Sequence, residues 1–190
     1  RYATAGVVTP DHTIRTKNWP VIVPAPDGAR LADFRTGARA AADAFSAHYR
    51  AYFDRNNARA GGTKTMLDPA PRVILVPGLG LFGLGRSKKD AAVAADLAEA
   101  AIEAITGAEA IGRYRPIGED DMFDVEYWSL EQAKLGSAKA PPLAGQIVAV
   151  TGAAGAIGRA TAKAFAAAGA EVALLDLDGK AAADKAKAIG

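Results

Sequence analysis

Three glycines that follow a short apolar run carry the clearest chemical signal in this 190-residue sequence. Gly152, Gly155 and Gly158 stand at intervals of three, directly after Thr151. Because glycine has no Cβ, a glycine-rich turn lets backbone N–H groups approach a ligand closely. Where such a turn opens a helix, the free N–H groups and the positive end of the helix dipole favour a phosphate group. The spacing therefore predicts a turn that holds a diphosphate.

The residues around this turn predict a strand, a helix and a second strand. Residues 146–150 are typical of a buried parallel strand. Residues 157–168 are rich in helix formers, and Gly169 is placed to end that helix. A second apolar strand covers residues 171–175, and Asp176 follows it at about the 20-residue spacing from the turn that a dinucleotide site needs. A carboxylate there can accept both hydroxyls of an adenosine ribose. We therefore expect an adenine dinucleotide site, and the alternative is a βαβ unit without a ligand.

The stretch 151–158, TGAAGAIG, resembles the cofactor turn of short-chain dehydrogenases. It matches the TGxxGxxG spelling completely and departs from TGxxxGxG at Ala156. The resemblance implies a Rossmann domain with a nicotinamide cofactor, bound by Thr151, Gly152, Gly155, Ile157, Gly158 and Asp176. We expect NAD rather than NADP, because the Asp176 carboxylate would repel a 2′-phosphate. Gly155 also takes the position where relatives that prefer NADP often carry a basic residue. The basic side chain of Arg159 offsets part of this expected preference for NAD.

A second glycine-rich stretch, residues 78–83, also spells GxGxxG after an apolar strand at 73–76. We reject it as a nucleotide turn, because the next helix begins only after Ser87 and no acidic strand end follows at the needed distance. Residues 81–84 instead indicate the second strand of a hairpin. The helix expected over 88–106 would turn inward Val93, Leu97, Ala101, Ile102 and Ile105.

This hairpin and helix resemble the closing segment of class II aldolase domains. In that family the hairpin carries a His-Gly pair whose histidine binds the catalytic metal. Here Leu79-Gly80 takes that place. The resemblance therefore implies that the ligand is lost, and we expect no metal site in this chain.

The first 71 residues contain strand, helix and loop signals. Val7-Val8 and residues 21–23 are strand candidates, separated by turn signals. His12 could serve a metal or acid–base site, but a polar turn is the simpler interpretation, because His48 is the only other histidine. Residues 31–56 predict a long amphipathic helix, followed by a loop to residue 71.

An acidic cluster opens the stretch 118–135. Its members, Glu119, Asp120, Asp121 and Asp124, could chelate a cation, but an acidic helix start is the favoured interpretation. Residues 136–145, GSAKAPPLAG, have the composition of a linker.

The order of these parts resembles the bifunctional class II aldolase/short-chain dehydrogenases of the rhamnulose-1-phosphate aldolase type, with FDVEYWSLEQAKL as the distinctive joint. The resemblance implies an α/β protein in three parts. Residues 1–135 would form an aldolase-like α/β region, 136–145 a linker, and 146–190 the first βαβ unit of a truncated Rossmann domain.

That family resemblance implies an NAD-dependent oxidoreductase that oxidises a small alcohol or aldehyde from rhamnose breakdown. Short-chain dehydrogenases use Ser, Tyr and Lys, with the last two spaced YxxxK, and none of the five tyrosines here has lysine four residues later. We therefore expect no catalytic residue in this chain. Two alternatives stay open: a metal-dependent aldolase acting on a sugar phosphate, and a non-catalytic scaffold or dimerisation module.

Composition restricts the other function classes. The 23 basic and 21 acidic residues give a net charge of +2, too small to imply nucleic acid. The absence of cysteine excludes disulfides, thiolate metal sites and cysteine nucleophiles. No apolar run is long enough for a membrane span, and no signal peptide opens the sequence. We expect a cytoplasmic homo-oligomer whose partners are a nicotinamide dinucleotide and, in the parent protein, a small-molecule substrate. The start at Arg1 and the presence of two of about six Rossmann strands indicate a piece of a longer protein.

Overall fold

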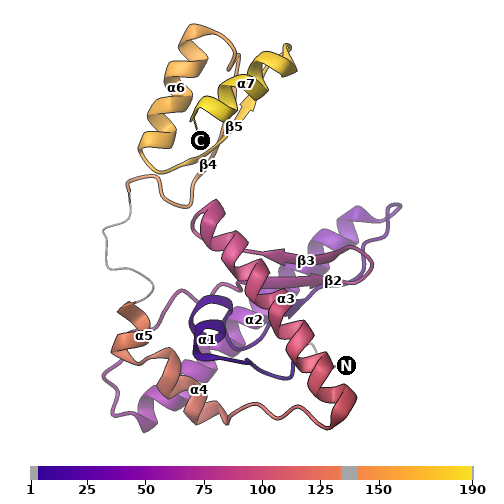
Figure 1. Cartoon of the computed structure of the whole chain (residues 1–190), viewed down its shortest axis with the longest axis vertical. Helices are drawn as coiled ribbons and strands as arrows, with labels where there is room; N and C mark the ends of the chain where they lie inside the picture. The colour runs from indigo at the N-terminus through magenta and orange to yellow at the C-terminus, as the bar shows by residue number, and fades with distance from the viewer. Residues whose placement is uncertain (1–3, 134–140, 190) are drawn as a thin grey trace. The chain divides into compact units, whose positions relative to one another are not determined.

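The computed structural model describes residues 4–133 and 141–189, and both stretches contain helices and strands. The chain divides into two compact units, one of residues 1–85 and 89–137, the other of residues 86–88 and 138–190. Both are drawn in Figure 1. The protein is thus a mixed α/β chain. Residues 136–140 of the predicted linker lie outside the described residues.

The first unit is built on a three-stranded sheet in the order β1–β2–β3. Strand β1 (Val21–Ile22) pairs in parallel with β2 (Val73–Val76), and β2 pairs antiparallel with β3 (Gly80–Gly83). The hairpin predicted from the sequence is confirmed. The second GxGxxG stretch supplies the hairpin turn and strand β3, with Gly78 and Gly80 at positive φ.

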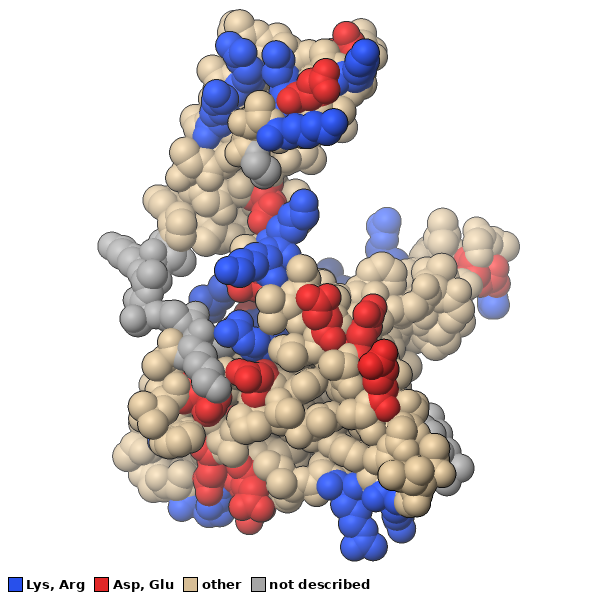
Figure 2. All heavy atoms as spheres, in the orientation of Figure 1, with Lys and Arg blue, Asp and Glu red and all other residues tan. Residues whose placement is uncertain are grey.

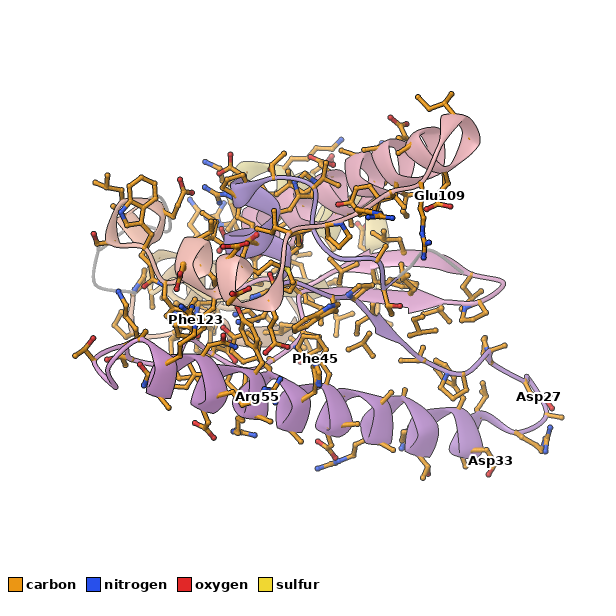
Figure 3. All side chains as sticks on the ribbon, turned by 90° about the horizontal axis from the view of Figure 1, so that it is seen from below. Asp27, Asp33, Phe45, Arg55, Glu109 and Phe123 are labelled. Atoms are coloured by element: carbon orange, nitrogen blue, oxygen red, sulfur yellow. The ribbon has the colours of Figure 1, made fainter. Side chains whose placement is uncertain are left out.

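Two long helices cover opposite faces of this sheet, as Figures 1 and 3 both show. Helix α2 (Leu31–Arg59) lies against the face that carries Val21, Val23 and Val76. Helix α3 (Lys88–Ile111) lies on the other face, and its first turns touch the hairpin closely. A Cβ on Gly83 would stand 2.1 Å from the Ala91 carbonyl oxygen, so only glycine fits there.

Aromatic side chains fill the core between α2, the sheet and α4 (Glu119–Glu126). Phe45 and Phe123 lie in this packed region, whereas Asp27 and Asp33 lie at the far, N-terminal end of α2 (Figure 3). Phe123 stacks on Tyr127 with ring centroids 4.5 Å apart. Two short helices, α1 (Pro10–Thr16) and α5 (Ser129–Ala133), contact α4.

Three sequence predictions for the first unit were wrong in detail. Val7-Val8 is not a strand, and the turn expected around His12 is the helix α1. Pro10 suits a first helical position, and contacts with α4 and α5 bury the residues that follow, so tertiary packing decides the conformation. In α3 the buried residues are Ala94, Ala98 and Ile105, and Ile102 is 46% exposed.

The second unit contains a strand–helix–strand–helix sequence. Strands β4 (Ile147–Thr151) and β5 (Glu171–Leu175) are parallel neighbours, joined by α6 (Ala156–Ala167), and α7 (Gly179–Ile189) follows. Apolar side chains on one sheet face, including Val148, Val150 and Val172, pack with Phe165 and Ala162 of α6. The βαβ arrangement expected from the sequence is therefore present. None of the described helices has the length and apolar character needed to span a membrane.

Candidate functional site

The strand register places the glycine turn beside Asp176. Thr151 and Leu175 are paired at the carboxyl ends of β4 and β5, so the residues after them emerge at one sheet edge. The Ala153 N–H donates to the Leu175 carbonyl oxygen at 3.2 Å. The Ala154 N–H donates to Asp176 Oδ2 at 2.9 Å. These two bonds fix the turn directly against the end of the second strand.

Gly152 and Gly158 hold the turn tightly against the helix that follows it. Gly152 has a φ of +64°, in the left-handed region, with no atom within 4 Å of an added Cβ. A Cβ on Gly158 would stand 2.2 Å from the Gly152 carbonyl oxygen and 2.8 Å from the Ala153 Cα. Glycine is thus required at 158 because the helix passes over the turn backbone at contact distance.

The first turn of α6 presents backbone N–H groups at this edge. Gly155 is the N-cap residue and makes no side-chain cap, and Ala156 begins the helix. The first N–H groups of a helix have no partner within it, and they carry the positive end of the helix dipole. Ile157 in this turn is 84% exposed, and Thr151 is exposed at the strand end. An anion of diphosphate size matches this arrangement chemically.

Asp176 is held as a carboxylate acceptor. Hydrogen bonds from the Ala154 N–H and the Asp178 N–H, at 2.9 and 3.1 Å, lower the pKa of Asp176. The group is therefore ionised at neutral pH. Two carboxylate oxygens offer about four acceptor positions, so capacity remains for both hydroxyls of a ribose. The six residues predicted as cofactor contacts thus share one edge of the second unit.

The first unit holds a buried polar cluster that sequence reasoning missed, formed by Lys17, Tyr49, Tyr52, Glu126 and Tyr127. Glu126 accepts from the Tyr49 hydroxyl at 2.7 Å and from the Tyr52 hydroxyl at 3.0 Å. The Tyr49 and Tyr127 hydroxyl oxygens are 2.7 Å apart. Lys17 Nζ lies 3.9 Å from Glu126 Oε1 and 3.7 Å from the centre of the Tyr49 ring.

Burial sets the electrostatics of this cluster. It lowers the pKa of Lys17 to about 8, although the Glu126 charge opposes the fall. It also raises the pKa of Glu126, against the Lys17 charge and the two tyrosine hydroxyls. Burial and the Glu126 charge raise the pKa of Tyr127 to about 12. A charge pair of this kind fixes the arrangement of α1, α2 and α4, since neither partner is accommodated alone.

The sequence offered only part of the signal for this cluster. Tyr49 and Tyr52 belong to the apolar stripe of the predicted helix, which marks them as buried. Glu126 lies in an acidic stretch, and nothing in its spacing distinguishes it from its exposed neighbours.

Those exposed neighbours form ion pairs with α2. Arg55 contacts Glu119 and Arg59 contacts Asp124. Basic and acidic atoms meet at this end of the unit in Figure 2. The favoured interpretation of an acidic helix start agrees with α4 beginning at Glu119. Across residues 4–133 and 141–189, no group of three or more His, Asp or Glu side chains is arranged to hold a metal ion.

Comparisons with known proteins give a family match for the first part of the chain and a relative that covers most of it. Residues 1–135 match the family described as "Aldolase class II, second domain". The chain is also 36% identical, over 180 residues, to a protein of Bacillus subtilis strain 168 called "Uncharacterized oxidoreductase YuxG". That similarity covers 91% of this chain and 25% of the relative, so the chain spans about a quarter of the relative's length. No solved structure matches the chain.

Proposed function

The chain belongs to the family of class II aldolase second domains, and from that premise we propose that it is part of an NAD-dependent short-chain dehydrogenase fused to an aldolase. The match to a protein named as an oxidoreductase covers 91% of the chain, so it extends beyond residues 1–135 into the second unit, and it supports the proposal. The parent protein would oxidise a small alcohol or aldehyde from sugar breakdown, of the rhamnulose 1-phosphate type.

The observation that carries the proposal is the hydrogen bond between the Ala154 N–H and the Asp176 carboxylate. It joins the two halves of an adenosine diphosphate site: the helix end suited to the diphosphate and the acid suited to the ribose. The close contact of Gly158 with the Gly152 carbonyl oxygen leaves no room for a side chain at position 158.

In this proposal each residue of the site has a separate task. The first-turn N–H groups of α6 hold the diphosphate, with Gly152 and Gly155 keeping its approach open. Asp176 accepts from the ribose hydroxyls and repels a 2′-phosphate, which favours NAD over NADP. Thr151 and Ile157 border the turn from the strand and helix sides. The nicotinamide supplies the hydride chemistry when bound, and the chain's own residues bind and orient its adenosine half.

We assign no aldol cleavage to residues 1–135. Leu79-Gly80 stands in the hairpin where the resembling aldolase segments carry a His-Gly pair.

Calorimetric titration of the 190-residue chain with NAD tests the proposal. We expect saturable binding that Asp176→Asn weakens by about tenfold or more, since a hydrogen bond to a charged group contributes about 1.5–3 kcal/mol. Asp184→Asn, an exposed acid on α7, is the matched control and should leave the affinity unchanged. NADP should bind more weakly than NAD to the wild-type chain and gain relative affinity in Asp176→Asn. Equal affinities of the wild-type chain and Asp176→Asn for NAD would refute the assignment.

A further inference from the structure

The first unit contains a cavity that the proposed function does not use. Its volume is about 270 Å³, and it lies between the sheet and α3. Strand residues Val73, Leu75 and Leu81 line one side, and α3 residues Ala98, Ala101 and Ile105 line the other. All of these residues belong to the same compact unit.

The cavity exists because α3 meets the sheet closely only at its start. Near Ala91 the helix touches the Gly83 backbone, where no Cβ fits. Farther along, the helix presents Ala98 and Ala101, whose side chains are too short to fill the space above Leu75 and Leu81. An engineered apolar cavity of about 150 Å³ takes up benzene. By that comparison the present cavity accommodates a molecule of about ten non-hydrogen atoms.

Most polar side chains that line the cavity already have partners. His12 contacts Thr9 Oγ1 through Nδ1 at 2.8 Å and the Leu97 carbonyl oxygen through Nε2 at 2.9 Å. Thr16 and Thr106 donate to carbonyl oxygens of their own helices at 2.7 Å. The Lys17 ammonium lies against the Tyr49 ring and near Glu126.

Asn18 differs from these residues. It lines the cavity and is 2% exposed, and within the described part of the chain neither Nδ2 nor Oδ1 has a hydrogen-bond partner of good geometry. The amide is close enough to the Tyr52 hydroxyl to offset part of the rise in that group's pKa. A buried amide without partners is costly, so each such group in a folded protein calls for an explanation.

We propose that this cavity binds a small, neutral molecule with a compact apolar body and one group that both donates and accepts hydrogen bonds, such as a carboxamide. The apolar body would fill the space between Leu81 and Ala101, and the polar group would pair with the Asn18 amide. The ligand is neutral because Lys17, the charged side chain among the described residues that line the cavity, is already paired with Glu126. A charged group would enter without compensation.

Methyl and amide NMR of the whole 190-residue chain, titrated with benzamide and with toluene, tests this proposal. Benzamide should give saturable shifts at the methyl groups of Leu81 and Ile105 and at the Asn18 side-chain amide. Toluene should bind the same cavity about tenfold more weakly, since it leaves Asn18 unpaired. No saturable shift at these groups with benzamide, or equal affinity for both probes, would overturn the proposal.

Three variants separate this site from adventitious binding. Ala101→Phe fills the cavity and should abolish binding of both probes, whereas Ala100→Phe, on an exposed position of the same helix, should leave both unchanged. Asn18→Leu keeps the bulk of the side chain and should bring the two affinities within about twofold. Benzamide binding that survives Ala101→Phe would place the probe elsewhere and end the proposal. Because Ala101→Phe leaves Asn18 intact, it also decides the question if Asn18→Leu fails to fold.

Discussion

Lys17 keeps its ammonium group in the core because a carboxylate and an aromatic face lie within 4 Å of it. The residue also has a φ of +64°, a left-handed conformation that a side chain of this kind rarely adopts. Strain of this type costs about 1–3 kcal/mol and persists only where the surroundings impose it. Lys17 directly follows α1 in the chain. Its strained backbone is therefore held in place by the pair with Glu126, whose carboxylate is itself fixed by Tyr49 and Tyr52.

The lowered pKa of Lys17 predicts a pH dependence of stability. The folded state releases this proton near pH 8, and the unfolded chain releases it near 10.5, so the unfolded state binds more protons between these values. The free energy of unfolding should therefore rise from pH 8 to 9.5, by up to about 1.4 kcal/mol per pH unit. Denaturant titrations at several pH values measure it. Lys17→Met should remove the rise, whereas Lys180→Met, at an exposed position, should keep it. A rise of equal slope in Lys17→Met would contradict this account.

Among the elements, the strands and long helices follow closely from the sequence. The apolar runs at 73–76 and 171–175 are strands with the expected bounds, and Gly169 ends α6 at positive φ. Local propensity and periodicity determine these elements, so the sequence alone predicts them. The helix α1 was not predicted, because its conformation depends on contacts with α4 and α5 that are distant in sequence. The partners of Glu126 were missed for the same reason: they lie 74 and 77 residues away.

The glycine turn offers a test at the level of one element. Gly158→Ala places a Cβ 2.2 Å from the Gly152 carbonyl oxygen, so the turn must shift. We expect a loss of about 1–3 kcal/mol of stability, the size typical of overpacking, together with weaker NAD binding. Gly179→Ala at the start of α7 has nothing within 4 Å of the new Cβ and should change neither property. Thermal unfolding and calorimetry of both variants give the comparison, and similar behaviour of the two would show that turn packing is unimportant.

For the whole molecule, the sequence joins the aldolase-like part and the proposed nucleotide-binding part in one chain. The family match covers residues 1–135, and the similarity to the Bacillus subtilis oxidoreductase covers 91% of the chain. Since the chain spans 25% of that relative, the activity of the complete protein stays a proposal. The face of the β4–β5 sheet opposite its core carries Ile147 and Leu175 at 82% and 51% exposure.

We predict that the 190-residue chain alone produces no NADH from any alcohol, even where it binds NAD. No tyrosine of the chain has a lysine four residues later, and hydride transfer in short-chain dehydrogenases uses that pair. Absorbance at the NADH band, followed with a panel of short-chain alcohols and aldehydes, measures this. A parent protein that carries a downstream YxxxK serves as the positive control. Steady turnover by the isolated chain would mean that other residues perform the chemistry.

The central claim is that residues 151–158 and Asp176 form the adenosine diphosphate site, and amide NMR during titration of the chain with NAD tests it most directly. The account predicts saturable shifts concentrated in the backbone amides of residues 152–158 and 176–178, and their loss at matched concentrations in Asp176→Asn. Shifts that do not saturate, or that fall mainly outside these two segments, would contradict it.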